Sequence, residues 1–147
     1  MPGPPPSLRT RALKALARRE HSRQELQAKL QPFAEDSGEI GPLLDDLEKR
    51  GWLSESRFVE QLTTVRRRRF GAARILHELR EKGVSAAALA AAQDQLKDSE
   101  VEAARSVWQK KFGSLPATVQ ERARQSRFLA SRGFSAEAVR KVLRSEE

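Results

Sequence analysis

The chain has no cysteine, no tyrosine and only two histidines among its 147 residues. The lack of cysteine excludes disulfides and thiolate metal sites, so helix packing has to provide the stability. The sequence has no apolar run of about 18 residues that could span a membrane, and its amino end lacks the apolar stretch of a signal peptide. We therefore expect a cytoplasmic protein.

Catalytic patterns are missing as well. His21 and His77 lie far apart and have no metal-ligand spacing such as His-x-x-x-His. Asp45 and Asp46 are adjacent, so on a helix they would diverge by about 100°, which is poor geometry for a shared metal. No Gly-x-x-x-x-Gly-Lys loop and no Gly-x-Ser-x-Gly turn occurs. We predict no enzyme, no cofactor and no metal site.

Positive charge is plentiful and unevenly placed. Lysine and arginine number 28 against 20 acidic residues, a net charge of +8. Residues 1–56 carry nine of each sign, so the whole surplus lies in residues 57–147. Such a surface attracts polyanions, and nucleic acid is the first partner to consider. Solvated cationic faces are the alternative explanation.

One junction pattern recurs three times: a cation and a glycine, then an apolar residue, then a serine. The copies are residues 50–54 (RGWLS), 82–85 (KGVS) and 132–135 (RGFS). Glycine can adopt the left-handed conformation that ends a helix, the cation suits the helix carboxyl end, and serine caps the next helix. The recurrence predicts a duplicated helical unit.

Apolar residues recur at helical spacing along nine segments, and no alternating run indicates a strand. We predict an all-α array of three tandem three-helix repeats over residues 8–53, 54–96 and 97–147, after a disordered tail at residues 1–7. Capping boxes are expected at Ser22 with Glu25 and at Ser99 with Glu102. Pro116 fits the first turn of a helix. Trp52 and Trp108 occupy apolar positions and are expected to be buried.

The order of several short motifs resembles the RecX family, the bacterial regulators of the RecA recombinase. The matching segments are residues 12–22 (ALKALARREHS) with Glu25-Leu26 and Lys29-Leu30, 47–53 (LEKRGWL), 57–59 (RFV), Gly71 with Arg74-Ile75, 78–83 (ELREKG), 127–129 (RFL) and 132–134 (RGF). They cover nearly the whole chain from Leu8. Two segments depart from the family pattern: residues 54–56 (SES) stand where acidic residues are usual, and residues 69–73 (RFGAA) replace a Gly-x-Gly-Pro turn.

The resemblance implies a non-enzymatic modulator without a cofactor. RecX-like proteins are elongated, curved arrays of three-helix repeats that lie in the groove of the RecA-DNA filament and damp filament growth, ATP hydrolysis and strand exchange. The implied partners are the RecA filament and single- or double-stranded DNA, bound weakly and without sequence preference. A monomer is expected, with a role in recombination and the SOS response.

Eight arginines are the candidate partner- or DNA-binding residues: Arg66, Arg67, Arg68, Arg69, Arg74, Arg80, Arg124 and Arg127. If residues 66–69 are helical, Arg67 and Arg68 point outward while Arg66 and Arg69 flank the apolar stripe of Phe58, Leu62 and Val65. The same four cations could instead complement a helix carboxyl end and lie along the edge of the core. Arg122 and Arg132 are interpreted as solvated.

A helix-turn-helix transcription regulator is the alternative function. Residues 43–53 resemble the helix end before the wing of winged-helix proteins, and basic helical chains often read operators. A wing needs a β-hairpin, whereas the sequence after Ser54 is predicted to be helical. Operator-selective binding would favour the regulator, and weak, salt-sensitive, sequence-indifferent binding would favour the filament modulator.

Overall fold

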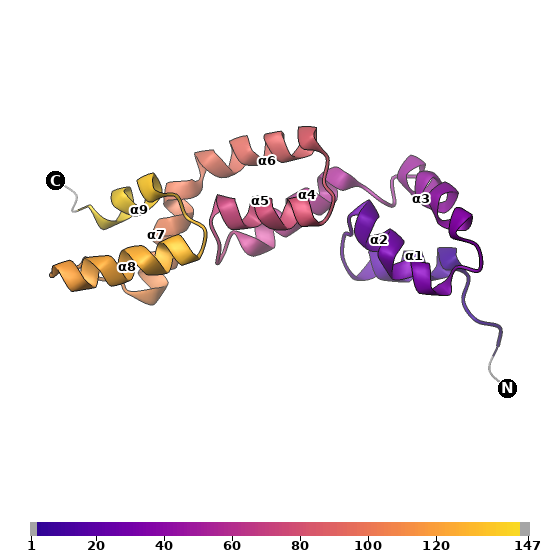
Figure 1. Cartoon of the computed structure of the whole chain (residues 1–147), viewed down its shortest axis with the longest axis horizontal. Helices are drawn as coiled ribbons and strands as arrows, with labels where there is room; N and C mark the ends of the chain where they lie inside the picture. Colours follow the sequence, from indigo (N-terminus) through magenta and orange to yellow (C-terminus); the bar gives the residue numbers. More distant parts are fainter. Residues whose placement is uncertain (1–2, 145–147) are drawn as a thin grey trace. The chain divides into compact units, whose positions relative to one another are not determined.

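The computed structural model describes residues 3–144, which form nine α-helices and two short 3-10 helices and contain no strand (Figure 1). The all-α prediction is therefore confirmed for this part of the chain. The α-helices are α1 (Leu8–Arg18), α2 (Arg23–Leu30), α3 (Ile40–Lys49), α4 (Glu55–Arg66), α5 (Ala72–Glu81), α6 (Ala86–Asp98), α7 (Glu100–Lys111), α8 (Val119–Ser131) and α9 (Ala136–Leu143). Within residues 3–144, none of them has the length and hydrophobicity that crossing a bilayer would need.

The chain divides into two compact units, and the division falls inside α4. One unit comprises Met1–Gln61 with Lys82–Val84, and the other comprises Leu62–Glu81 with Ser85–Glu147. Each unit is described by itself below. The division into three repeats at residues 8–53, 54–96 and 97–147 remains a prediction.

The first unit has its core between α1, α2 and α3. Ser7, within the predicted tail, instead caps α1 by accepting a hydrogen bond from the Thr10 amide at 3.1 Å, while residues 3–6 form no regular element. Ser22 and Glu25 form the predicted capping box at the start of α2. Between α2 and α3, the predicted loop contains the two 3-10 helices, η1 (Gln31–Phe33) and η2 (Ser37–Glu39). The buried core side chains are Ala12, Ala15, Leu26, Leu30, Ile40, Leu44, Leu47 and Leu53.

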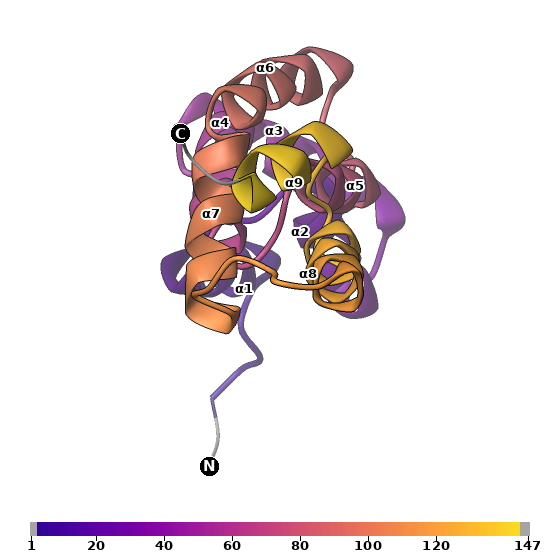
Figure 2. The ribbon, with the colours of Figure 1, turned by 90° about the vertical axis from the view of Figure 1, so that its left-hand side faces the viewer.

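The second unit has its main core between α7, α8 and α9, which lie together in both views (Figures 1 and 2). Trp108 is buried there as predicted, and its indole Nε1 donates to the Gln125 Oε1 at 2.8 Å. Gln125 is itself buried and donates to the Ser114 carbonyl, so both polar groups are paired. The other buried members are Ala104, Val107, Leu129, Phe134, Ala138, Val139, Val142 and Leu143.

The three glycine corners are left-handed as predicted, with φ of 78° at Gly51, 80° at Gly83 and 92° at Gly133. They are not equivalent, however. Gly83 and Gly133 each join the second and third helices of a triplet, α5 to α6 and α8 to α9, whereas Gly51 joins α3 to α4. The recurring motif is therefore a general way to end a helix, and only its second and third copies occupy the same place in a repeated unit.

The second and third corners also pack closely against the start of another helix in their own unit. A Cβ on Gly83 would lie 2.3 Å from the Gln24 Oε1, near the start of α2. A Cβ on Gly71, just before α5, would lie 2.3 Å from the carbonyl oxygen of Gly133. Nothing lies within 4 Å of a Cβ on Gly51. Glycine at residues 71 and 133 thus permits direct backbone contact between the third corner and the residue just before α5.

Several local expectations are wrong. Ser99 makes no capping hydrogen bond and Glu102 has no capping-box role, because α6 ends at Asp98 and α7 begins at Glu100 with no extended residue between them. Pro116 lies outside α8, which begins at Val119 after the Thr118 cap. Trp52 is 44% exposed, because the first corner has two apolar residues and Leu53 takes the buried position. Val65, expected in the inner stripe of α4, is also exposed.

Candidate partner and nucleic-acid interface

The four consecutive arginines lie at the end of α4 and differ in their surroundings. Only Arg66 is helical, and residues 67–69 form a turn before α5. The predicted helical rotation therefore does not apply beyond Arg66. Arg66 and Arg67 are half-buried, whereas Arg68 and Arg69 are exposed.

Arg67 makes the most buried ion pair of the second unit. Its Nη1 lies 2.7 Å from the Glu100 Oε1, and the two side chains are only 14% and 10% exposed. Its Nη2 also donates to the Leu96 carbonyl and to the Ser99 Oγ at the junction of α6 and α7. The prediction that Arg67 points outward is wrong, because the turn after α4 aims this guanidinium at a buried carboxylate that sequence spacing could not reveal.

Glu100 is the first residue of α7, and its hydrogen bonds link this helix to the starts of two others. Besides Arg67, its carboxylate accepts from the Ala72 amide at 3.1 Å and the Ser135 amide at 3.2 Å, at the starts of α5 and α9. A carboxylate buried with a cation and two amide donors is satisfied, whereas any one of these groups alone would be costly to bury. This network fixes the turn that carries Arg68 and Arg69.

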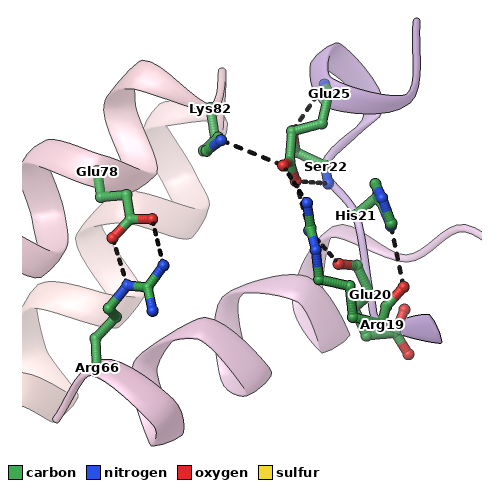
Figure 3. A network of polar contacts seen from close by, with 8 residues as sticks. All are labelled: Arg19, Glu20, His21, Ser22, Glu25, Arg66, Glu78 and Lys82. Carbon is green, nitrogen blue, oxygen red and sulfur yellow. Dashed lines mark hydrogen bonds and ion pairs between the residues drawn. The ribbon is translucent and has the colours of Figure 1, made fainter. Parts of the chain in front are cut away.

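Arg66 is also held by a carboxylate. Its Nε and Nη2 donate to the two Glu78 oxygens at 2.8 and 3.1 Å, so the pair is bidentate (Figure 3). The hydrogen bonds that Arg66 donates to the Glu78 carboxylate raise the pKa of Arg66 above its ordinary value. Arg66 therefore joins the end of α4 to α5 and has less freedom to bind an external anion.

Arg68 and Arg69 stand beside a cluster of cations and aromatic rings where Gly71, just before α5, meets the Gly133 corner. The guanidinium carbon of Arg74 lies 4.3 Å from the Phe70 ring centre, and that of Arg132 lies 5.7 Å from Phe70 and 4.8 Å from Phe128. Arg132 Nη1 also donates to the Arg69 carbonyl at 3.3 Å. Cations stacked on aromatic faces keep their charge while losing side-chain freedom.

We define the corner cluster as Arg68, Arg69, Arg74, Arg132 and the Phe70 ring. Three of its arginines are among the predicted candidates, and Arg132 is a residue that sequence reasoning interpreted as solvated. The sequence signal that could have identified Arg132 is the repeated cation-glycine corner, because Arg132 is the cation of the third copy and the second and third copies occupy equivalent places between helices. Within residues 3–144, no carboxylate forms a salt bridge with any of these four arginines.

The remaining candidates are exposed but are not part of the corner cluster. Arg124 and Arg127 are on α8, and Arg80 is near the end of α5. Arg80 lines a groove that also contains residues of α6, α7 and α9. The structure thus leaves six of the eight predicted arginines exposed and uses Arg66 and Arg67 in internal ion pairs.

The first unit has its own polar network, centred on Glu25 (Figure 3). The Glu25 carboxylate accepts from Arg19 at 2.8 and 3.1 Å, from the Ser22 amide at 3.1 Å and from Lys82 Nζ at 3.2 Å. Burial works to raise the pKa of Glu25, but the hydrogen bonds from Arg19, Ser22 and Lys82 outweigh it and lower the pKa to about 2. Glu25 therefore ties the start of α2 to the second glycine corner.

Neither histidine has the surroundings of a catalytic base or a metal ligand. His21 is 2% exposed, its Nδ1 lies 3.0 Å from the Arg19 carbonyl oxygen, and burial lowers its pKa. His77 is exposed on α5 and pairs with Glu81 at 2.6 Å. In the described part of the chain, no three histidine or acidic side chains are grouped so that they could hold a metal ion.

The fold and these surfaces define a class: an all-α protein of tandem three-helix domains with a cationic corner cluster. Residues 54–92 match the RecX second three-helix domain, and residues 98–143 match the third. The regulatory protein RecX of Leptothrix cholodnii is 54% identical over 94% of this chain and 88% of its own length. That of Ralstonia nicotianae is 44% identical over all of this chain and 92% of its own. The chain belongs to the RecX family.

A solved structure supports the same fold. The crystal structure of RecX from Lactobacillus salivarius superposes with a TM-score of 0.77, covering 92% of each chain at 16% identity. At this identity the likeness concerns the fold alone. The resemblance predicted from the sequence motifs is thus confirmed at the level of family and fold.

Proposed function

We propose that this protein regulates the RecA recombinase by binding the RecA-DNA filament in its groove and damping filament growth, ATP hydrolysis and strand exchange. The observation that carries this proposal is membership of the RecX family over almost the full chain. The proposed regulator is a cytoplasmic, monomeric, non-enzymatic protein that acts in recombination and the SOS response.

The corner cluster is the proposed centre of contact, together with the exposed Arg124 and Arg127 of α8. Support comes from the separation of roles among the arginines: Arg66 and Arg67 are committed to Glu78 and Glu100, while Arg68 and Arg69 have exposed side chains without acidic partners in residues 3–144. Arg74 and Arg132 are restrained on aromatic faces, and an arginine held in this way can bind a phosphate or a carboxylate with little loss of entropy. The DNA contact proposed here is made to the phosphate backbone, so it is weak and indifferent to sequence.

A RecA ATPase assay on single-stranded DNA tests the proposal. The protein, added below the concentration of RecA, should lower the rate of ATP hydrolysis, and Arg68→Glu with Arg69→Glu should remove most of this effect. The matched control is Lys14→Glu with Arg18→Glu, two exposed cations of α1 whose reversal changes the net charge equally. An ATPase rate that stays constant across a wide range of protein concentration would count against RecA regulation, and equal effects of the two double variants would count against this surface.

The helix-turn-helix regulator is the other candidate. In the described residues no β-hairpin follows Leu53, and α4 begins at Glu55. A footprinting experiment with the isolated protein distinguishes the two functions, because protection of one operator sequence would favour the transcription regulator. Uniform, salt-sensitive protection is the outcome expected for the filament modulator.

A further inference from the structure

Two of the three glycine corners pack in the same way, each on the start of a helix. Gly83 lies against Gln24, the second residue of α2, and Gly133 lies against Arg74, the third residue of α5. Both α2 and α5 are the second helices of their triplets, and each receives the corner of the next triplet along the chain. The contact between a corner and a helix start thus occurs once in each unit.

The second helix of the last triplet, α8, begins with the same residue pattern as α2. A capping residue, Ser22 or Thr118, is followed by one further residue, a glutamine and a glutamate. In α2 the glutamine contacts Gly83 and the glutamate binds Lys82 Nζ at 3.2 Å. The equivalent glutamate of α8, Glu121, forms no salt bridge within residues 3–144. The start of α8 therefore has the residue types that bind a corner, and none of the three corners lies on it.

Apolar side chains are exposed at this same place. Val119, the first residue of α8, is 81% exposed, and Leu115 in the preceding loop is also exposed. The residue of α2 that corresponds to Val119 is Arg23, so the apolar side chain is particular to α8. The last unit of a repeat array keeps an unpaired joining surface unless a polar cap covers it. The start of α8 has such a surface, and its composition suits an apolar partner.

The first corner is the one that is left without a helix start. Among the described residues, nothing lies within 4 Å of a Cβ on Gly51. This corner has one more apolar residue than the other two, and that residue, Trp52, is exposed. Its cation, Arg50, donates from Nε to Asp46 at 2.9 Å and lies 5.4 Å from the Trp52 ring centre, so the guanidinium is restrained beside the ring. One corner and one helix start are thus unmatched, and both expose apolar groups.

We propose that the first corner of one copy of this chain binds the start of α8 in a second copy, so that copies join head to tail. Trp52 covers Val119 in this contact. Arg50 binds Glu121, as the cation of the second corner binds its glutamate within the chain. Because the two surfaces differ, every pair keeps one of each free, and the association is open-ended. The contact is small, so dilute protein stays monomeric and copies associate when they are concentrated or held side by side on one polymer.

Sedimentation velocity of the purified full-length protein, at concentrations up to about 1 mM, tests this contact. The parent protein should form assemblies that grow with concentration. Trp52→Ser and Val119→Ser should each weaken the association at least about tenfold and therefore leave monomers. An equimolar mixture of these two variants should form dimers and nothing larger, because the intact corner of one variant meets the intact helix start of the other.

Phe33→Ser and Val65→Ser are the matched controls, because they replace exposed apolar residues in the first and second units. Both controls should associate as the parent protein does, and circular dichroism checks that each variant is folded. A parent protein that stays monomeric to about 1 mM, or a mixture without dimers, would overturn the proposal. Association that survives in either single variant, or that is lost equally in the controls, would overturn it as well. The inference goes beyond the proposed function, because none of these measurements involves RecA or DNA.

Discussion

Replacing Gly71 with alanine is the sharpest test of how the corner cluster is built. The added Cβ would lie 2.3 Å from the Gly133 carbonyl oxygen and 2.4 Å from both the Gly133 carbonyl carbon and the Phe134 nitrogen. All three atoms belong to the backbone, so no side chain can rotate away to make room. The backbone at Gly71 and the Gly133 corner would therefore have to move apart.

The cost follows from what such a separation breaks. The Gly71 amide donates to the Arg132 carbonyl at 2.8 Å, and the Ala73 amide donates to the Gly133 carbonyl at 3.3 Å. Overpacking costs about 1–3 kcal/mol, and each lost hydrogen bond costs about 1 kcal/mol. We expect Gly71→Ala to lower the free energy of unfolding of the second unit by about 3 kcal/mol.

Urea unfolding followed by Trp108 fluorescence, in a Trp52→Phe background, measures the second unit separately, because Trp108 is buried in its core. The matched control is Gly41→Ala in α3, where nothing lies within 4 Å of the new Cβ. It should leave the Trp108 unfolding transition unchanged, because α3 belongs to the first unit. If Gly71→Ala unfolded at the same urea concentration as the parent protein, the close contact between Gly71 and the Gly133 corner would be refuted.

Glu100 and Glu25 give further predictions. Glu100→Ala should lower the free energy of unfolding by about 3–5 kcal/mol, because Arg67 and the Ala72 and Ser135 amides lose their shared acceptor. Urea denaturation measures this change. A loss below about 1 kcal/mol would contradict the role of the network. The pKa of Glu25 is lowered from 4.5 to about 2 in the folded protein, so its contribution to stability is complete above pH 4.5 and disappears as the pH falls toward 2. Because the carboxylate is partly solvated, we expect about 1–2 kcal/mol of pH-dependent stability over this range. Glu25→Gln should remove that dependence, and an unchanged pH profile in this variant would show that Glu25 is not its source.

The helices could be predicted because their signals are local. The spacing of Leu26 and Leu30, the Ser22 cap and the left-handed glycines act within one or two turns of the chain, and the structure has them as expected. Local signals failed where neighbouring elements compete. Ser99 turns its hydroxyl to other groups because α6 and α7 leave no room for a cap, and Trp52 is displaced outward because Leu53 fills the core.

The candidate site could be predicted only as a set of charges. The sequence places four arginines together, but which of them remain available depends on acidic residues far along the chain. Glu100 lies 33 residues after Arg67 and binds it in the structure. Arg132, 63 residues after Arg69, joins the same cluster because the Gly133 corner packs against Gly71. No periodicity within a single helix contains such information.

The sequence by itself therefore determined the all-α fold, the family and the surplus of positive charge, since composition, short-range spacing and capping chemistry act on neighbouring residues. Tertiary structure alone decided which arginines are held by carboxylates and which side chains form the corner cluster. These properties depend on distances between residues brought together by folding, and in this chain the Gly71–Gly133 contact and the Glu100 network set those distances.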